Sequence, residues 1–389
     1  MHHRTVKAAL AATALAAVLA LSACTAAGTA TATPDASSAA TEGAPGTGGS
    51  AVGFIMVGPR DDFGYNQAVY EAAQVVGESY PDLEILTAEN VPEDDTAVAT
   101  MEQMIDRGAK VIFATSYGHL DAATKVAAAH PDVVVVQQGN TIEGAPLANM
   151  GTYFGTVYEP MYLAGIAAGE ATESNKLGYV YAFPIPQTIA NINAFQRGAA
   201  SVNPDVETVT VSTSSWCDPG AQKDAASSLL SQGVDVITQH QDCTKTVIDA
   251  TEAAGAFTVG YHADASELAP QGWLTGAVWD WAPLYGQIVD NITAGEFVGG
   301  PFNANYRVGY KTGTNPFVLA DFGTSVSEDT KAAIAEAQAW LGTEDGSPFV
   351  GPVLDQDGAT VVPDGVIPTY DEVDGMNYFV DGVIGSLAN

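Results

Sequence analysis

The sequence predicts an α/β protein with two doubly wound, Rossmann-like lobes and a ligand cleft between them. Short apolar runs, such as residues 52–57 and 133–136, alternate with helical stretches such as residues 65–77. Strands this apolar are typical of parallel sheets that helices cover on both faces. The same order of landmarks returns about 125 residues further along the chain. The repeat therefore predicts two similar lobes.

The first lobe is expected to contain four strands separated by helices. The predicted strands are residues 52–57, 83–86, 111–114 and 133–136. A helix can begin at Asp95, whose side chain suits an N-cap, and end at Gly108. Its apolar residues share one helical face: Ala97, Met101, Met104 and Ile105.

Three landmarks carry the repeat. Residues 52–55 match 177–180, residues 80–84 match 203–207, and residues 108–112 match 233–237. Asp218 and Pro219 supply an N-cap and a first-turn proline for a helix in the second copy. We expect lobe I to comprise residues 51–154 with about 262–295, and lobe II to comprise residues 155–261 with about 296–389.

The N-terminus has the pattern of an export signal. A short basic segment precedes the apolar run 8–20, which is too short to span ~30 Å of hydrocarbon as a helix. The run ends in Leu21-Ser22-Ala23-Cys24, which resembles a lipobox. We predict a lipoprotein signal peptide over residues 1–23 and a lipid on Cys24. The alternative is an ordinary signal peptide cut after Ala23.

Residues 24–50 are predicted to form a lipidated, flexible tether. They are almost wholly Ala, Thr, Ser, Gly and Pro, which cannot bury enough surface to offset the entropy of ordering. The protein is then expected at the cell membrane, lipid-anchored on the extracytoplasmic face.

In this oxidising, extracytoplasmic setting a disulfide between Cys217 and Cys243 is predicted. Two buried free thiols are the alternative.

Composition and motifs argue against several classes of function. The chain has 46 acidic and 13 basic residues and a net charge of −33, so nucleic acid is not an expected partner. The sequence contains no GxSxG, Walker or HExxH motif, and its histidines lack metal-ligand spacing. We therefore expect no enzyme, no cofactor and no metal.

The cleft residues can be predicted from strand order, because open α/β sheets bind ligands beyond the carboxyl ends of their strands. The corresponding loops are residues 60–66, 115–121, 183–187, 214–218, 239–244 and 261–264. Their candidate ligand-binding side chains are Tyr65, Asn66, Tyr117, Asp121, Trp216, Gln239, His240, Asp242 and Asp264. Aromatic rings with a few amides and carboxylates suit a flat, neutral, heteroaromatic ligand.

Many short segments resemble the basic membrane protein family, the purine-nucleoside-receptor-like substrate-binding lipoproteins of ABC transporters. The matching segments are residues 62–66, 113–118, 151–155, 162–165, 182–186, 192–195, 202–205, 236–240, 278–281 and 376–383. The resemblance implies a type I periplasmic binding protein fold. It also implies an importer component that captures a purine base or nucleoside and delivers it to permease and ATPase subunits.

The resemblance further implies roles for individual residues. Tyr65 and Asn66 correspond to an aromatic–Asn pair that stacks on the base and bonds to it, and Trp216 corresponds to the second stacking aromatic. Asp264 corresponds to a ribose-binding aspartate. Trp279 stands where the family has a ribose-contacting lysine, which favours a free base. Asp121 is a candidate acceptor at the ring edge.

Three alternatives stay open beside a purine importer. They are a sensory lipoprotein, a binding protein for another small neutral ligand, and a nucleoside hydrolase that uses the cleft aspartates.

Overall fold

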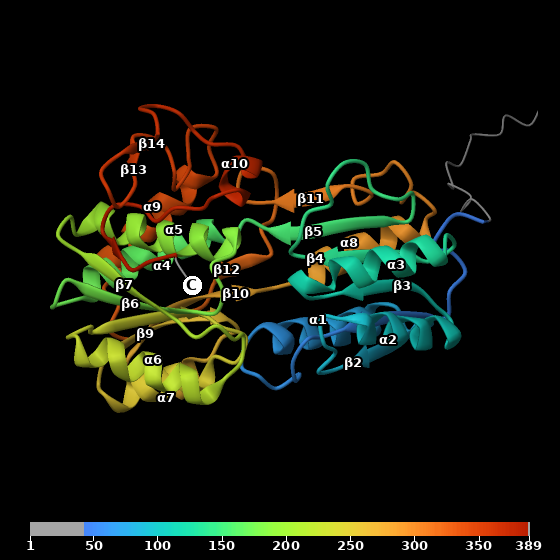
Figure 1. The fold of residues 1–389 in the computed structure, drawn as a ribbon, viewed down its shortest axis with the longest axis horizontal. Helices are drawn as coiled ribbons and strands as arrows, with labels where there is room; N and C mark the ends of the chain where they lie inside the picture. Colours follow the sequence, from blue (N-terminus) through green and yellow to red (C-terminus); the bar gives the residue numbers. More distant parts are fainter. Residues whose placement is uncertain (1–42, 388–389) are drawn as a thin grey trace, which may run out of the picture. The chain divides into compact units, whose positions relative to one another are not determined.

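The computed structural model describes residues 43–387. Helices and strands alternate along these residues and build two large, mainly parallel sheets (Figure 1). The predicted α/β class with two doubly wound lobes is confirmed. The predicted signal peptide, Cys24 and the first part of the tether lie outside the described residues.

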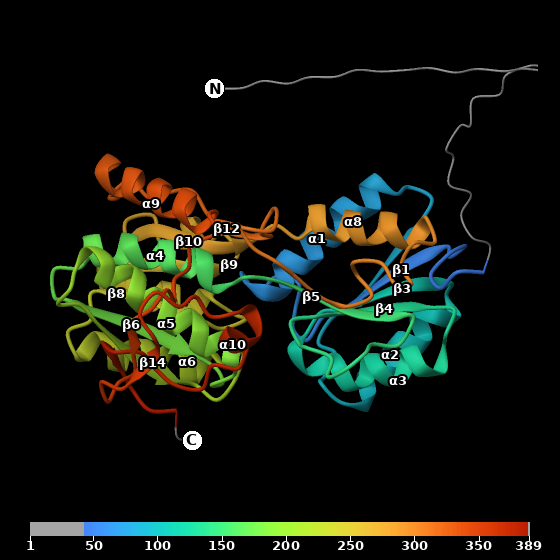
Figure 2. The ribbon, with the colours of Figure 1, turned by 90° about the horizontal axis from the view of Figure 1, so that it is seen from above.

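The first lobe is built on a six-stranded sheet with the order β11-β5-β4-β3-β1-β2, in which every neighbouring pair is parallel. Its strands are β1 (Ala51–Ile55), β2 (Glu84–Ala88), β3 (Ala109–Ala114), β4 (Val134–Gln138), β5 (Met150–Gly155) and β11 (Asn305–Val308). Its helices are α1 (Tyr65–Ser79), α2 (Asp95–Asp106), α3 (Leu120–Ala129) and α8 (Ala282–Thr293). Figure 2 shows α1 and α8 on one face of the sheet and α2 and α3 on the other.

The second lobe is built on a seven-stranded sheet with the order β12-β10-β9-β8-β6-β7-β15. Its strands are β6 (Lys176–Tyr181), β7 (Glu207–Ser212), β8 (Val236–His240), β9 (Phe257–His262), β10 (Trp273–Trp279), β12 (Phe317–Leu319) and β15 (Val383–Ile384). Only β12 runs antiparallel to its neighbour within this sheet. The covering helices are α4 (Tyr158–Ala171), α5 (Pro186–Val202), α6 (Pro219–Ser231), α7 (Lys245–Ala253) and α9 (Glu328–Leu341). Figure 1 shows α4 and α5 on one face and α6 and α7 on the other.

Shorter elements complete the chain. They are the 3₁₀ turns η1 (Tyr117–His119) and η2 (Ser266–Leu268), the small hairpin β13 (Val353–Leu354) and β14 (Thr360–Val362), and helix α10 (Tyr370–Asp374).

The helix-capping signals were read correctly to within one residue. The N-cap of α2 is Asp94 rather than Asp95, and its carboxylate accepts a hydrogen bond from the Thr96 amide. Gly108 ends this helix with φ +97°, a conformation that glycine adopts without strain. Asp218 caps α6 by accepting from the Ala221 amide, and Pro219 fills the first turn as expected.

The expected lobe boundaries need one correction. The structure places β10 in the second sheet, beside β9, so residues 262–295 do not form one first-lobe segment. The late strand of the first sheet is β11, beyond the expected boundary. Its residues are mostly half-exposed, so it lacks the apolar run that marks a buried strand. The chain crosses between the sheets after β5, after β10 and after β11.

The expected tether also ends earlier than residue 50. The Gly46 amide donates to the Asp132 carbonyl at 3.0 Å, and the Ser50 amide donates to the Gly108 carbonyl at 3.2 Å. Gly46 is buried against the first lobe. Its lack of a side chain permits this contact, because a Cβ would overlap Ile292. Within residues 43–387, no helix combines the length and apolarity that a membrane crossing requires.

Candidate functional site

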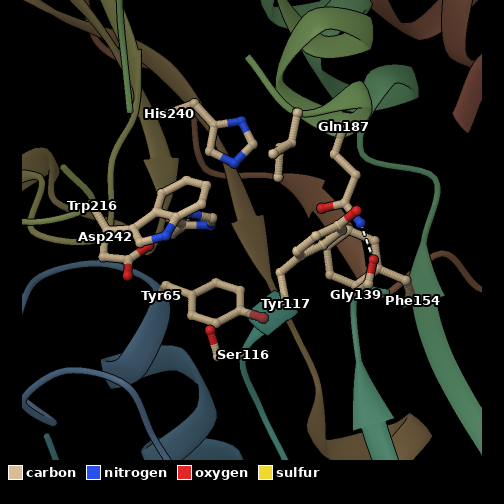
Figure 3. A pocket seen from close by; sticks show the side chains of 11 residues that line it. Tyr65, Ser116, Tyr117, Gly139, Phe154, Gln187, Trp216, His240 and Asp242 are labelled. Carbon is tan, nitrogen blue, oxygen red and sulfur yellow. Dashed lines mark hydrogen bonds between the residues drawn. The ribbon is translucent and has the colours of Figure 1, made fainter. Parts of the chain in front are cut away.

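A cavity of about 30 Å³ lies where loops from the two lobes meet (Figure 3). Its lining residues are Tyr65, Ser116, Tyr117, Gly139, Phe154, Ile185, Gln187, Trp216, His240, Asp242 and His262. Most of them follow the carboxyl ends of parallel strands, as expected for open α/β sheets. A water molecule needs roughly 10–15 Å³ of such space, so the cavity holds one or two. A ring-sized ligand therefore requires the lining side chains to move apart.

Tyr65 begins α1 and presents a buried ring to the cavity. Its hydroxyl accepts a hydrogen bond from the Gln138 amide at 2.6 Å. The Gln138 side-chain oxygen in turn accepts from the hydroxyls of Tyr153 and Tyr285, both at 2.8 Å. Burial raises the pKa of Tyr65 well above its ordinary value, so the phenol stays neutral. This network fixes one aromatic wall of the site.

Trp216 supplies an aromatic wall from the second lobe. Its ring meets Phe183 edge-on at 5.2 Å between centroids and lies 5.9 Å from the His240 ring. Tyr65 and Trp216, which sequence reasoning paired as stacking residues, thus line the same cavity from opposite lobes. Figure 3 shows Tyr117 bordering the same space.

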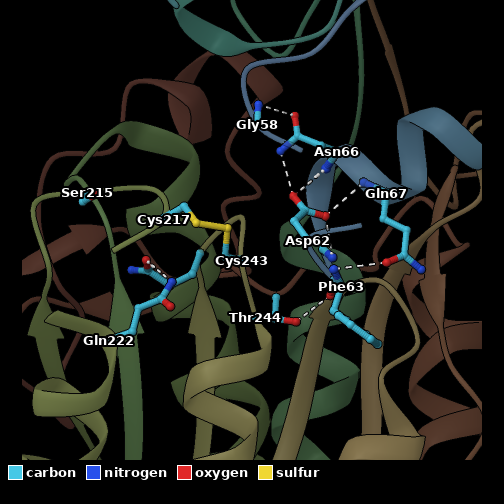
Figure 4. Close-up of a disulfide and its surroundings, with 12 residues drawn as sticks. Gly58, Asp62, Phe63, Asn66, Gln67, Ser215, Cys217, Gln222, Cys243 and Thr244 are labelled. Atoms are coloured by element: carbon cyan, nitrogen blue, oxygen red, sulfur yellow. Dashed lines mark hydrogen bonds between the residues drawn. A yellow bond between two sulfur atoms is a disulfide. The ribbon is translucent and has the colours of Figure 1, made fainter. Parts of the chain in front are cut away.

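Asp242 is the one carboxylate among the lining residues. Its backbone amide donates to the Trp216 carbonyl at 2.9 Å, and the next residue, Cys243, forms a disulfide with Cys217 (Figure 4). Burial, with smaller contributions from the charges of Asp62 and Glu93, raises the pKa of Asp242 well above its usual range. Within residues 43–387 no hydrogen bond contributes to the pKa of this carboxyl group. It lines the cavity and is therefore within reach of a ligand.

Two buried histidines complete the polar lining. Burial lowers the pKa of His240 to about 3 and takes the pKa of His262 well below its ordinary value, with a further contribution from His240 to the latter. Both rings are therefore neutral at physiological pH. The indole N–H of Trp279 donates to Nδ1 of His262 at 2.8 Å.

Asn66 lies beside Tyr65 but is not among the residues that line the cavity, so its hydrogen bond to the ligand stays a prediction. Its side-chain oxygen accepts from the Gly58 amide at 3.0 Å, and its Nδ2 donates to Asp62 at 2.7 Å (Figure 4). Asp62 also accepts from the amides of Gly64, Asn66 and Gln67. The pair therefore organises the loop that leads into α1.

Four further candidate residues also lie off the cavity wall. Gln239 is buried, and its side-chain amide donates to the Thr244 carbonyl at 3.0 Å. Asp121 is exposed in the first turn of α3, and Asp264 is exposed and accepts from the Ser266 amide at 2.9 Å. Trp279 is buried behind His262 and stacks on Trp281 at 4.1 Å. Asp264 thus accepts within its own turn, and the indole of Trp279 donates to His262. The expected ligand contacts of both residues stay predictions.

Sequence reasoning missed several residues of the cavity. His262, Ser116, Ile185 and Gln187 fall inside the predicted loops but were not among the candidate binding residues, whereas the candidate His240 does line the cavity. Gly139 and Phe154 fall outside those loops: one follows β4, and the other lies in the crossing strand β5. The Gln187 side-chain amide donates to the Gly139 carbonyl and so joins the lobes at this edge. Among the described residues, no cluster of His, Cys, Asp or Glu could hold a metal ion.

Two doubly wound lobes with a cavity at their strand ends define a two-lobed solute-binding protein. Comparison with known proteins gives the family. Residues 50–338 match the Bmp family model, described as ABC transporter substrate-binding protein PnrA-like, and the chain belongs to this family. The predicted resemblance is confirmed, and the chain is a substrate-binding protein of an ABC transporter.

Individual relatives agree with this assignment. A purine-binding protein of Brucella abortus is 34% identical over 341 residues, covering 86% of this chain and 93% of the relative. A putative ABC transporter glucose-binding protein of Haloferax volcanii is 31% identical over 334 residues, covering 86% and 80%. Basic membrane protein A2 of Borrelia garinii is 25% identical and covers 62% of this chain and 72% of its own length.

Solved structures show the same fold. The ABC transporter solute-binding protein from Aeropyrum pernix superposes with a TM-score of 0.64 at 18% identity, covering 84% of this chain and 96% of the other. The corresponding protein from Conexibacter woesei gives 0.61 at 22% identity, covering 75% and 95%. The type I periplasmic binding fold is therefore shown, and the family membership points to binding rather than catalysis.

Proposed function

We propose that this protein captures a purine base outside the cytoplasm and delivers it to the permease and ATPase subunits of an ABC importer. The observation that carries the proposal is the pairing of Tyr65 and Trp216, which line one cavity from opposite lobes. A planar base between two such rings gains roughly 1–3 kcal/mol from each stacking contact. The purine-binding relative is consistent with this ligand class.

The polar lining supports a neutral ligand. Of the described residues that line the cavity, none is a lysine or arginine. Its titratable side chains, Asp242, His240 and His262, are driven by burial toward their uncharged forms. A phosphorylated ligand would find no countercharge there. A neutral heterocycle can instead exchange hydrogen bonds with Asp242 and the histidines.

A free base is favoured over a nucleoside. The aspartate expected to hold ribose, Asp264, is exposed and caps a local turn, and Trp279 takes the place of the expected lysine. A neutral sugar is the second candidate, because the Haloferax relative is named as a putative glucose-binding protein.

Calorimetry decides among these ligands. We expect tight binding of adenine, hypoxanthine or guanine, weaker binding of the matching nucleosides, and no heat from glucose. Trp216→Ala should weaken purine binding by one to two orders of magnitude, at roughly 1.4 kcal/mol per tenfold. Tight glucose binding without heat from any purine would replace the purine assignment with a sugar one.

We also propose that a lipid on Cys24 anchors the protein at the extracytoplasmic face of the membrane. The basic segment, the apolar run and the Ala23-Cys24 site support this. A stable anchor needs two acyl chains, as a diacylglyceryl thioether provides. Cys24→Ala should move the protein from the detergent phase to the aqueous phase on Triton X-114 partitioning. Unchanged partitioning would contradict the anchor and leave the ligand proposal intact.

A further inference from the structure

We propose that His262 is a fixed hydrogen-bond donor to the ligand through Nε2–H, and that Trp279 is the positioning residue that fixes it. The ligand must then present a lone-pair acceptor to His262, such as a bare ring nitrogen or an exocyclic carbonyl oxygen. This inference rests on the proposed function for the purine class of ligand, and it deepens that function by naming the acceptor requirement.

The hydrogen bond from Trp279 determines the proton position on His262. An indole nitrogen is a donor only, so the 2.8 Å contact from Nε1 of Trp279 requires a lone pair on Nδ1 of His262. The imidazolium form and the Nδ1–H tautomer both place a proton at that atom, so both are excluded. A neutral imidazole without a proton on Nδ1 carries it on Nε2.

That Nε2–H group has no partner within the described part of the chain. His262 is 2% exposed, and its Nε2 is buried and makes no hydrogen bond to residues 43–387. The residue nevertheless lines the cavity, beside Tyr65 and Asp242. Buried donors in folded proteins are almost always paired, so an orphan at a binding cavity points to a ligand.

Packed aromatic rings hold the side chains of Trp279 and His262 in their orientations. Trp279 is stacked on Trp281 at 4.1 Å and packed against Phe317 at 4.1 Å. The centroids of the His262 and Tyr261 rings are 4.0 Å apart, and the His262 backbone has φ +72°, a left-handed conformation that is uncommon outside glycine. A donor held in this way is oriented before the ligand arrives, so binding does not have to order it.

The first experiment tests the tautomer without any ligand. Long-range ¹H–¹⁵N correlation spectra of the histidine rings in the unliganded protein should show His262 protonated at Nε2 alone at neutral pH. Trp279→Phe should convert this signal to a mixture of tautomers. The matched control is Trp281→Phe, because the Trp281 indole N–H has no partner among residues 43–387 and its loss should leave the His262 signal unchanged. Protonation at Nδ1, or no effect of Trp279→Phe, would overturn the positioning role.

The second experiment tests the donor with ligand analogues. Calorimetry compares hypoxanthine with its 3-deaza and 7-deaza analogues and with purine, each of which lacks one acceptor. One analogue should bind wild-type protein about tenfold more weakly than hypoxanthine, the usual cost of leaving a buried donor unpaired. The same analogue should show no such penalty in His262→Phe. His262→Gln, which restores an N–H group, should restore part of the discrimination.

The outcomes separate this inference from the proposed function. If every analogue loses the same affinity in wild type and in His262→Phe, the donor role is wrong although the purine assignment holds. If no purine binds to wild-type protein, the purine assignment fails, and the ligand-free spectra still decide whether Trp279 fixes the His262 tautomer. Thermal melting of each variant establishes that it is folded.

Discussion

At Gly64 the backbones of the two lobes come into direct contact. A Cβ at this position would overlap the carbonyl group of Asp242, which belongs to the opposite lobe. The neighbouring Tyr65 amide donates to that same carbonyl at 3.4 Å, and the Thr244 hydroxyl donates to the Phe63 carbonyl. Only a residue without a side chain allows the loop before α1 to meet the loop after β8 in this way.

We expect Gly64→Ala to weaken ligand binding by at least tenfold, because the added methyl group meets backbone atoms that cannot move aside locally. The lobes would have to stay apart, so small-angle scattering with saturating ligand should also give a larger radius of gyration than for wild type. Gly286→Ala is the matched control, since a Cβ there meets only the Tyr80 hydroxyl at 3.8 Å. Wild-type affinity in Gly64→Ala would contradict the role of this contact.

Residue positions were predictable where strand order alone decides them. Tyr65, Tyr117, Trp216 and Asp242 follow strand ends and do line the cavity. Asn66 follows the same strand, but its direction depends on the Asp62 carboxylate and the Gly58 amide, which come together only in the folded loop. No sequence pattern carries that information. The Trp279–His262 hydrogen bond likewise depends on the register between β9 and β10.

The loops after β7 and β8 are joined by the disulfide between Cys217 and Cys243, whose Cα atoms are 5.1 Å apart. The two strands are not neighbours, because β6 lies between them. Each cysteine directly follows a cavity residue, Trp216 in one loop and Asp242 in the other. The disulfide therefore restricts the movement of Trp216, an aromatic wall of the cavity, relative to the lining carboxylate of Asp242.

Replacing both cysteines, Cys217→Ser with Cys243→Ser, should lower both stability and ligand affinity. Opening a loop of 26 residues costs about 3 kcal/mol in the free energy of unfolding, which denaturant titration measures. Affinity should fall as well, because Trp216 and Asp242 gain freedom that binding must remove. Reduction of wild-type protein serves as the control and should reproduce both effects. A loss of stability with unchanged affinity would limit the disulfide to a role in the fold.

At the scale of elements, the sequence predicts where strands occur better than it predicts which sheet each strand joins. The apolar run of β10 is visible in the sequence, yet nothing local distinguishes a strand of the second sheet from one of the first. The crossing strand β11 is short and half-exposed, so its pairing with β5 stabilises it more than its own composition does. Pairing partners are a property of the assembled sheet.

Another contact between the lobes involves helix α10, near the C-terminus of the chain. The hydroxyl of Thr141, in the loop after β4, donates to the Asp374 carboxylate at 3.0 Å. Arg307 of β11 donates to the Tyr370 hydroxyl at 2.9 Å and lies over the ring of that tyrosine at 5.4 Å. Arg307 also donates to Thr141 at 3.1 Å. These hydrogen bonds connect helix α10 of the second lobe to the part of the first lobe that borders the cleft.

We expect Thr141→Val to shift the molecule toward a more open arrangement and to weaken ligand binding by about three- to tenfold. The substitution keeps the side-chain shape but removes the hydroxyl shared by Asp374 and Arg307, and a lost hydrogen bond of this kind costs about 1 kcal/mol.

Thr100→Val is the matched control, because the Thr100 hydroxyl forms its hydrogen bond within helix α2 of one lobe. Calorimetry measures the ligand affinity, and small-angle scattering measures how far the lobes open. If the contact acts across the lobes, the affinity loss should come with a larger radius of gyration in the absence of ligand. A lower melting temperature with unchanged affinity and radius would instead mean that the contact stabilises the fold without influencing closure.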